Sequence, residues 1–270
     1  MSNRPKLVAI LNITEDSFSD GGRYLSPAAA LAQARDLISE GADILELGPA
    51  SSNPDAQRVP AEEQIARLRP VLEGLRDSTS HSVPISIDAT EPEVIRFALK
   101  EGVAFLNDIR GFPDPELHDE LASGEAALIV MHSLLERDRA TRDAAKPEEV
   151  LDSVERFFES RLTSLTKAGV AEDRLIIDPG MGFFLGSNPE ASLTMLRRIP
   201  ELRRRFGRPV LISVSRKSFL RKITGSKVEA IGPATLAAEL YAAEQGADFL
   251  RTHDVAAIGD ALKIRAALAR

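Results

Sequence analysis

The pattern that decides the fold is complete within residues 6–48, where KLVAILN (6–12) is followed by SPAAALAQARDLISEGA (26–42) and ADILELG (42–48). The first and last segments are apolar runs too short for a helix and without polar alternation, which is typical of strands buried on both faces of a parallel sheet. The middle segment has helical spacing, with Ser26 and Pro27 as its predicted start and Gly41 as its predicted end. Together they predict one strand, helix and strand unit.

The same alternation continues along the chain. Six further apolar runs are VPISIDA (83–89), AFLNDI (104–109), AALIVMH (126–132), RLIIDPG (174–180), PVLISVS (209–215) and DFLRTHD (248–254). Six further helical segments cover residues 59–75, 91–102, 146–169, 188–207, 231–247 and 255–269. Eight strands alternating with helices predict an α/β fold, a single (β/α)8 TIM barrel over residues 1–270. An open nucleotide-binding sheet is disfavoured because the polar run from Asn12 to Gly22 stands where such a sheet has a glycine-rich turn.

Composition excludes several classes of protein. The chain has 34 Lys and Arg against 41 Asp and Glu, a net charge of −7, and this balance gives no basic face for nucleic acid. It has no cysteine, so disulfides and thiolate chemistry are excluded. No stretch approaches the roughly 20 apolar residues of a membrane span, and the first residues do not resemble a signal peptide. We therefore expect a cytoplasmic protein without a membrane partner.

Polar residues stand at the carboxyl end of every predicted strand. They are Asn12, Glu46, Asp88, Asn107 with Asp108, His132, Asp178, Ser215 to Lys217, and Arg251 with His253. One such residue alone is more often a turn residue or a helix cap. In a barrel, however, all eight ends meet at one mouth, where isolated charges are costly unless they serve a ligand. The set therefore predicts an active site.

The residue types indicate what that site binds. Arg216, Lys217, Arg251 and His253 come from the last two strands and predict a cationic corner, a common place for phosphate in barrels. The alternative for residues 215–218 is a solvated basic loop. Asp88, Asn107 and Asp178 lie across from the corner and offer the acceptors and donors that a flat, aminated ring requires. The predicted ligand has a phosphate end and an aminated ring end.

Eight ordered segments resemble the dihydropteroate synthases, which join a pterin pyrophosphate to p-aminobenzoate. They are LNITEDSFSDGG (11–22), GADILELG (41–48), ISIDATEPEV (85–94), FLNDIRGF (105–112), VMHS (130–133), IIDPGMGF (176–183), SVSRKSF (213–219) and RTHDV (251–255). A full ordered set of this kind is far more specific than any single short motif. The resemblance extends over nearly the whole chain.

The resemblance implies roles for particular residues. The catalytic, pterin-binding set would be Asp88, Asn107, Asp178 and Lys217. Ile109 and Met131 would line the pterin slot, and Arg251 would cover the ring. Pyrophosphate would be held by Asn12, Arg251 and His253 with Arg216 beside them, and Asn12 would also contact Mg²⁺. Phe183 and Ser218 would border the p-aminobenzoate pocket, and residues 13–24 and 49–59 would be loops that close over the site.

The implied reaction follows from the charges. The exocyclic C–O bond of the pterin breaks toward pyrophosphate, whose charge Mg²⁺ and the cationic corner stabilise. Asp178 balances the developing pterin cation, and the aniline nitrogen of p-aminobenzoate attacks it. Loop closure would exclude the water that competes for the cation.

Two segments depart from the usual family pattern. The loop that commonly reads GGESTRPGA is GPASSNPDA here (48–56), so Asn53 replaces an arginine that helps to close the loop. The segment that commonly reads GFGKTPE is GFFLGSNPE (182–190), two residues longer and adjacent to Phe183. Both departures resemble the sulfonamide-insensitive Sul type, and they predict a p-aminobenzoate pocket that rejects the bulkier drugs. The alternative is a neutral loop variation.

Two other functions fit part of the pattern. A pterin-binding methyltransferase domain would share the ring-binding residues but would not need the residues SRKS (215–218) and RTHDV (251–255). A catalytically inactive pterin-binding module would have no reason to keep charge at every strand end. The last two helices carry apolar residues that a homodimer could use as its interface. Packing of these residues on the barrel is the simpler interpretation. They are Leu236, Leu240, Leu262 and Ile264.

Overall fold

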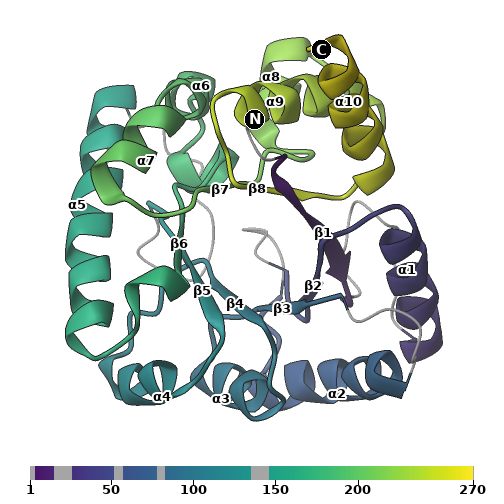
Figure 1. Cartoon of the computed structure of the whole chain (residues 1–270), viewed down its shortest axis with the longest axis vertical. Helices are drawn as coiled ribbons and strands as arrows, with labels where there is room; N and C mark the ends of the chain where they lie inside the picture. Colours follow the sequence, from purple (N-terminus) through teal and green to yellow (C-terminus); the bar gives the residue numbers. More distant parts are fainter. Residues whose placement is uncertain (1–3, 15–25, 52–56, 78–82, 135–145, 270) are drawn as a thin grey trace.

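The structure, a computed structural model, describes residues 4–14, 26–51, 57–77, 83–134 and 146–269, which form one barrel of strands inside a ring of helices (Figure 1). The strands are β1 (Lys6–Asn12), β2 (Ile44–Gly48), β3 (Ile85–Asp88), β4 (Phe105–Asp108), β5 (Ala127–Met131), β6 (Leu175–Asp178), β7 (Leu211–Ile212) and β8 (Phe249–Thr252). Each lies within one of the eight apolar runs. The predicted (β/α)8 barrel is therefore confirmed.

The sheet is parallel and nearly closed. Its order is β6-β5-β4-β3-β2-β1-β8-β7, so β1 pairs with both β2 and β8. The remaining seam between β6 and β7 is joined by a single bridge between Ile177 and Val210, with the Ile177 amide donating to the Pro209 carbonyl at 3.0 Å. β7 is much shorter than the predicted run 209–215. Pro209 contributes to this because it lacks the N–H that a ladder requires.

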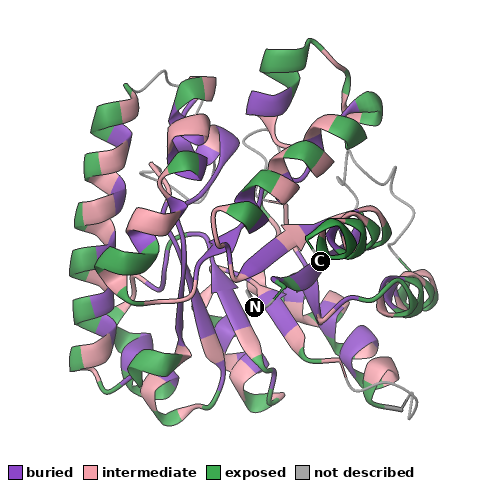
Figure 2. Ribbon diagram, turned by 45° about the horizontal axis from the view of Figure 1, so that its top comes forward, coloured by how far each residue is buried: buried purple, intermediate pink, exposed green. Residues whose placement is uncertain are grey.

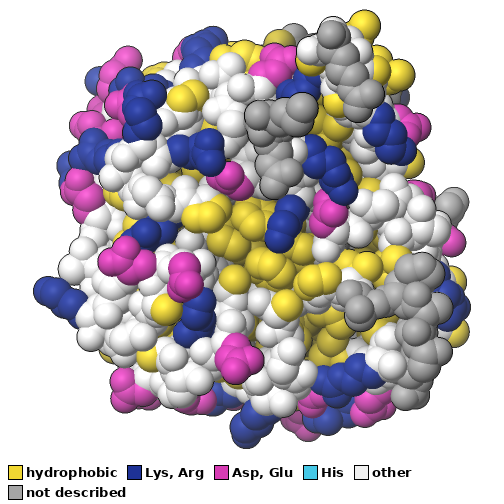
Figure 3. All heavy atoms as spheres, viewed as in Figure 1, with side chains coloured by type: hydrophobic (Ala, Val, Ile, Leu, Met, Phe, Trp, Pro, Cys, Tyr) yellow, Lys and Arg dark blue, Asp and Glu magenta, His cyan; other side chains and the backbone are white. Residues whose placement is uncertain are grey.

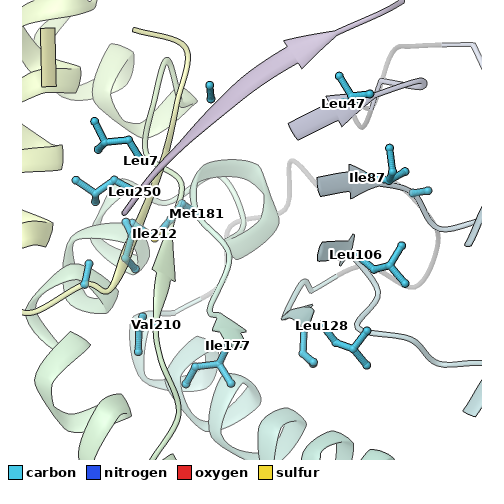
Figure 4. Close-up of a cluster of buried hydrophobic side chains, with 14 of the residues drawn as sticks. Leu7, Leu47, Ile87, Leu106, Leu128, Ile177, Met181, Val210, Ile212 and Leu250 are labelled. Carbon is cyan, nitrogen blue, oxygen red and sulfur yellow. The ribbon is translucent and has the colours of Figure 1, made fainter. Parts of the chain in front are cut away.

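Two apolar layers arise from the alternation of side chains along each strand. One layer fills the barrel itself; it consists of Val8, Ile44, Ile129, Ile176, Leu211 and Phe249. The other faces outward against the helices and includes Leu47, Ile87, Leu106, Leu128 and Leu250, which point away from the barrel axis in Figure 4. Burying both strand faces explains why the runs lack polar alternation.

The helices cover the outside of the barrel, with their outer sides exposed (Figure 2). They are α1 (Pro27–Ser39), α2 (Ala61–Asp77), α3 (Pro92–Lys100), α4 (His118–Ser123), α5 (Pro147–Lys167), α6 (Pro189–Arg197), α7 (Ile199–Phe206), α8 (Ser218–Thr224), α9 (Gly232–Glu244) and α10 (Val255–Leu268). The predicted cap is present, since the Ser26 hydroxyl accepts from the Ala29 amide at 3.2 Å.

The helical predictions need three corrections. The segment 188–207 is two helices, α6 and α7, because Pro200 cannot donate a backbone hydrogen bond and would break a continuous helix. The short helices α4 and α8 were not expected. Their six and seven residues are too few to show a helical period.

The last two helices carry the residues expected either to pack on the barrel or to form a dimer face. Leu262 is 5% exposed and Ile264 is 63% exposed, so α10 presents one side to the core and another to solvent. The homodimer remains a prediction.

In Figure 3 hydrophobic side chains gather at the centre of the face in view, with charged side chains mostly around them. Within the described residues, every helix is too short or too polar to cross a membrane.

Candidate functional site

The functional side chains lie directly above the inner apolar layer. Glu46 follows Ile44 by two residues and Asp178 follows Ile176 by two, so each acid continues the inward face of its strand. The same step places Asn107 after Phe105, Met131 after Ile129 and Arg251 after Phe249. The strand register then brings neighbours together, because Asp88 pairs with Asn107 and Met131 pairs with Asp178. A polar layer therefore occupies the carboxyl end of the barrel.

Glu46 is the hub of this layer. Its carboxylate is fully buried and forms an ion pair with the Arg251 guanidinium. The Ser86 hydroxyl donates to Glu46 Oε2 at 3.0 Å, and Asn107 Nδ2 donates to the same oxygen at 3.1 Å. The opposite end of the guanidinium reaches Asp88, whose Oδ2 lies 2.8 Å from Arg251 Nη2. Arg251 thus crosses the mouth between two carboxylates, one on β2 and one on β3.

The side-chain amide of Asn107 uses its nitrogen in a hydrogen bond, whereas its oxygen has no partner among the described residues. Its Nδ2 donates to Glu46, which fixes the orientation of the group. Its Oδ1 is buried without a hydrogen-bond partner among the described residues. Leaving a buried acceptor unpaired costs about 1–3 kcal/mol. The open oxygen therefore points to a ligand that supplies an N–H or O–H donor.

Asp178 and Lys217 form the second charged group. Asp178 is 1% exposed and accepts from the Gly180 amide at 2.8 Å. Burial raises the pKa of Asp178 to about 6, although the Gly180 amide and the charge of Lys217 act in the opposite direction. Burial likewise lowers the pKa of Lys217 to about 8, and the nearby Arg251 charge adds to this effect. Both groups are charged at neutral pH and can be titrated near it.

A small apolar cluster lies beside these charges. Ile109, Met131 and Phe184 form a small buried cluster of their own, apart from the two main layers. Lys217 Nζ lies 4.7 Å from the centre of the Phe184 ring, a cation–π geometry. The predicted slot residues Ile109 and Met131 are therefore together. A flat ring placed between this cluster and Asp178 would meet both apolar and polar walls.

The predicted cationic corner consists of three cations and one neutral imidazole. Burial lowers the pKa of His253 well below its usual range, and the charges of Arg216, Arg251 and Lys217 lower it further. The positive charge of the corner therefore comes from Arg216, Lys217 and Arg251 rather than from His253. Burial opposes the charge of Arg251, but Glu46 and Asp88 outweigh it and raise the pKa of the guanidinium. Arg216 has a positive φ of 58°, an uncommon backbone conformation for a residue with a side chain.

The remaining predicted residues lie around this centre. Asn12 ends β1 opposite Gly48 of β2, and its Oδ1 is 2.9 Å from where a Cβ on Gly48 would stand. Glycine at position 48 therefore gives the amide its space. Ser218 begins α8, with its hydroxyl beside Gly182. Phe183 lies in a short 3-10 helix (Gly182–Leu185) and is partly buried.

Two strand-end residues do not face the mouth. Asp108 is adjacent to Asn107 in β4, so its side chain points to the opposite face of the sheet. Its carboxylate accepts from the amides of Arg110 at 2.9 Å and Phe112 at 2.7 Å. His132 follows Met131, and its ring hydrogen-bonds the Pro179 carbonyl at 3.2 Å and the Ser153 hydroxyl at 3.1 Å. The expectation that all strand-end groups share one mouth is wrong for these two, because adjacent residues of a strand point to opposite faces.

Two residues of the site had no role predicted from the sequence. Glu46 was noted at a strand end, and its spacing of two from Ile44 was the signal that it faces inward. Phe184 lay in the lengthened segment, where no pattern indicates which of two adjacent phenylalanines turns inward. Asn53 and residues 15–24 of the first loop lie outside the described residues.

Comparisons with known proteins agree on one family. Residues 8–253 match the family model described as pterin binding enzyme. Dihydropteroate synthase type-2 of Escherichia coli is 53% identical over 262 residues, which cover 97% of this chain and 95% of that one. Dihydropteroate synthase type-3 of Escherichia coli is 50% identical over 97% of this chain and 99% of its own length. The solved dihydropteroate synthase of Xanthomonas albilineans with 4-aminobenzoic acid superposes with a TM-score of 0.87, at 37% identity over 99% of this chain and 94% of that one.

Proposed function

Because the chain belongs to the family of pterin binding enzymes, we infer that it is a dihydropteroate synthase of the Sul type. It condenses 6-hydroxymethyl-7,8-dihydropterin pyrophosphate with p-aminobenzoate. A C–N bond forms, the exocyclic C–O bond breaks, and pyrophosphate and a proton leave. The observation that carries this function is the set formed by buried Asn107 and Asp178 with half-buried Lys217, in which Asn107 Oδ1 has no partner among the described residues.

The pterin edge complements this set. A pterin presents an amino group and a ring N–H side by side, both donors, and Asp178 and Asn107 Oδ1 present acceptors. Glu46 holds the Asn107 amide from behind, so that its oxygen rather than its nitrogen faces the ligand. Ile109, Met131 and Phe184 supply the apolar wall of the slot. Asp178, with its negative charge in a buried site, stabilises the cation that develops on the pterin as the C–O bond breaks.

The pyrophosphate end meets Arg251, Lys217 and a neutral His253. The Ser215 hydroxyl accepts from the His253 amide at 3.2 Å, so its own hydrogen is free to bond His253 Nδ1 at 3.0 Å. This assignment leaves the ring proton on Nε2, where it can be donated to a phosphate oxygen. The corner thus stabilises the leaving group by fixed donors and by its three cations, Arg216, Lys217 and Arg251.

Magnesium fits this site only together with the substrate. Among the described residues no three acidic, cysteine or histidine side chains are grouped to hold a metal. Asn12 offers one carboxamide oxygen at the mouth, and Mg²⁺ is commonly bound by one or two protein oxygens together with substrate phosphates. Asn12 would hold the ion, which when bound neutralises charge on the departing pyrophosphate.

Reduced sensitivity to sulfonamides is the finer part of the proposal. The lengthened segment forms a 3-10 helix that places Phe184 beneath Lys217 and Gly182 beside the Ser218 hydroxyl, with Phe183 partly buried between them in sequence. The turn is fixed by the Gly186 amide, which donates to the Phe183 carbonyl at 3.2 Å, and by the Leu134 amide, which donates to the Phe184 carbonyl at 2.9 Å. A wall fixed in this way can accept a flat carboxylate and reject a bulkier sulfonyl substituent. The cytoplasmic location remains a prediction.

The test is release of pyrophosphate from the pterin substrate with and without p-aminobenzoate, and with added sulfamethoxazole. We expect release that requires p-aminobenzoate and persists with the drug. If the drug abolishes pyrophosphate release at the concentration that inhibits a synthase carrying GFGKTPE, this result contradicts only the reduced sensitivity. Absence of turnover in folded enzyme would favour an inactive pterin-binding module, and methyl transfer to or from a methylated pterin would favour the methyltransferase alternative.

A further inference from the structure

A cavity lies outside the pterin site, beside the ends of β7 and β8. Its volume is about 340 Å³, within the usual range for small-molecule sites. It is lined by residues of α9, the start of α10 and a 3-10 helix (Val228–Ala230), and by Ser215 and Arg216. The pterin-site residues Asp88, Asn107 and Asp178 do not line it.

Glu239 of α9 lines this cavity and is 2% exposed. Its Oε1 has no hydrogen-bond partner among the described residues, while the Thr252 side chain hydrogen-bonds the same carboxyl group. Burial raises the pKa of Glu239 to about 8, the nearby charge of Asp254 contributes to this, and the Thr252 hydrogen bond opposes it. A buried acceptor without a partner is costly for folding, so a ligand in the cavity that donated to Glu239 would remove this cost.

The other lining residues define the chemistry of that ligand. Glu229 and Asp254 are exposed carboxylates at the cavity, so acids outnumber the single cation among its lining residues, Arg216. Apolar walls are provided by residues such as Val228 and Leu236. An ammonium or amidinium group is a strong donor to a buried carboxylate, and a short apolar body would contact the walls.

We propose that this cavity is a second ligand site, which binds a small molecule carrying an ammonium or amidinium group on a short apolar body, with the cationic group on Glu239. The site adjoins the pyrophosphate corner. Ser215 lines the cavity and also bonds His253, and Thr252 is the last residue of β8, between Arg251 and His253 in sequence. A ligand there contacts the segments that carry the corner without occupying the pterin slot.

The experiment is calorimetric titration of the full-length enzyme with benzylamine, using benzyl alcohol as a neutral probe of the same shape. We expect benzylamine to bind, and to bind at least about tenfold more weakly to Glu239→Gln, because the buried ion pair is lost. The matched control is Glu244→Gln, an exposed acid on the same helix that does not line the cavity; its affinity should equal that of the wild type. At pH 7 the binding of benzylamine should also release the proton of the Glu239 carboxyl group. The buffer takes up this proton, so the measured binding enthalpy should differ from one buffer to another.

Three results would overturn the proposal. They are no binding of benzylamine to the wild type, equal affinity of benzylamine and benzyl alcohol, and loss of benzylamine binding when the pterin pyrophosphate is saturating. If Glu239→Gln does not fold, Leu236→Trp provides the test, since it fills the cavity from the wall and should abolish binding while Glu239 is retained. Turnover measured on the wild type is independent of all these results, so failure here does not bear on the synthase activity.

Discussion

Asp178 and Asp108 are both buried acids at the ends of barrel strands, yet they differ in what stabilises them. Asp108 faces outward, where two backbone amides donate to its two oxygens. Asp178 faces the mouth, where one backbone amide donates to Oδ1 and the remaining stabilisation comes from charges across the site. A carboxylate whose two oxygens both accept from backbone amides stabilises the loop that supplies those amides. A carboxylate with an oxygen that no backbone amide occupies can bind a substrate. Burial alone therefore does not identify a catalytic acid.

The largest expected effect is on the inward acid. We expect Asp178→Asn to lower kcat by about 10²–10³ while the protein stays folded, because the amide removes the charge and presents a donor to the pterin donors. Steady-state pyrophosphate release, with circular dichroism as the control for folding, measures this. Near-normal turnover in the folded variant would remove the distinction between the two aspartates.

The hub of the inward layer should have the next largest effect. Glu46→Gln keeps the size of the side chain but removes the charge that holds Arg251, and its amide can compete for the Asn107 amide. We expect KM for the pterin pyrophosphate to rise roughly 10- to 100-fold, as for loss of hydrogen bonds to a charged group. Glu46→Asp keeps the charge and should restore part of the affinity. A change in thermal stability alone, with KM unchanged, would assign Glu46 a purely structural role.

The pH dependence of kcat/KM tests the charged pair of the site. Turnover requires ionised Asp178 and protonated Lys217, so the rate should fall below about pH 6 and above about pH 8, about tenfold for each further pH unit. The sign is opposite at the two ends because one group must lose its proton and the other must keep it. Lys217→Arg should remove the alkaline limb only. An alkaline limb that persists unchanged in this variant would contradict the assignment.

The smallest effect on activity is expected for the outward acid. Asp108→Asn replaces one charged acceptor with an amide group that cannot accept at both positions, so we expect a loss of about 1–3 kcal/mol in the free energy of unfolding. Turnover of the folded variant should change less than about threefold. Urea denaturation and the pyrophosphate assay measure the two quantities. A loss of activity like that of Asp178→Asn would show that orientation in the barrel does not separate the two roles.

Much of the site was accessible from residue order alone. The apolar runs predict the strands, and strand-end position selects Asp88, Asn107, Asp178 and Arg251, all of which the structure brings to one layer. The charge of His253 was not accessible, because it depends on burial and on cations from distant segments. The split of residues 188–207 into α6 and α7 could have been predicted from Pro200, whereas the short helices α4 and α8 have no clear period.

The sequence by itself determined the barrel, because burying both faces of a strand requires continuous apolar runs and closing eight of them requires the repeated helix between. It also determined which residues stand at the strand ends. Only the tertiary structure decided which of them meet. The register sets Asp88 beside Asn107, and closure brings Arg251 from β8 to Glu46 on β2 across 205 positions of sequence. Those contacts depend on how the strands are positioned in space, which no local pattern of residues encodes.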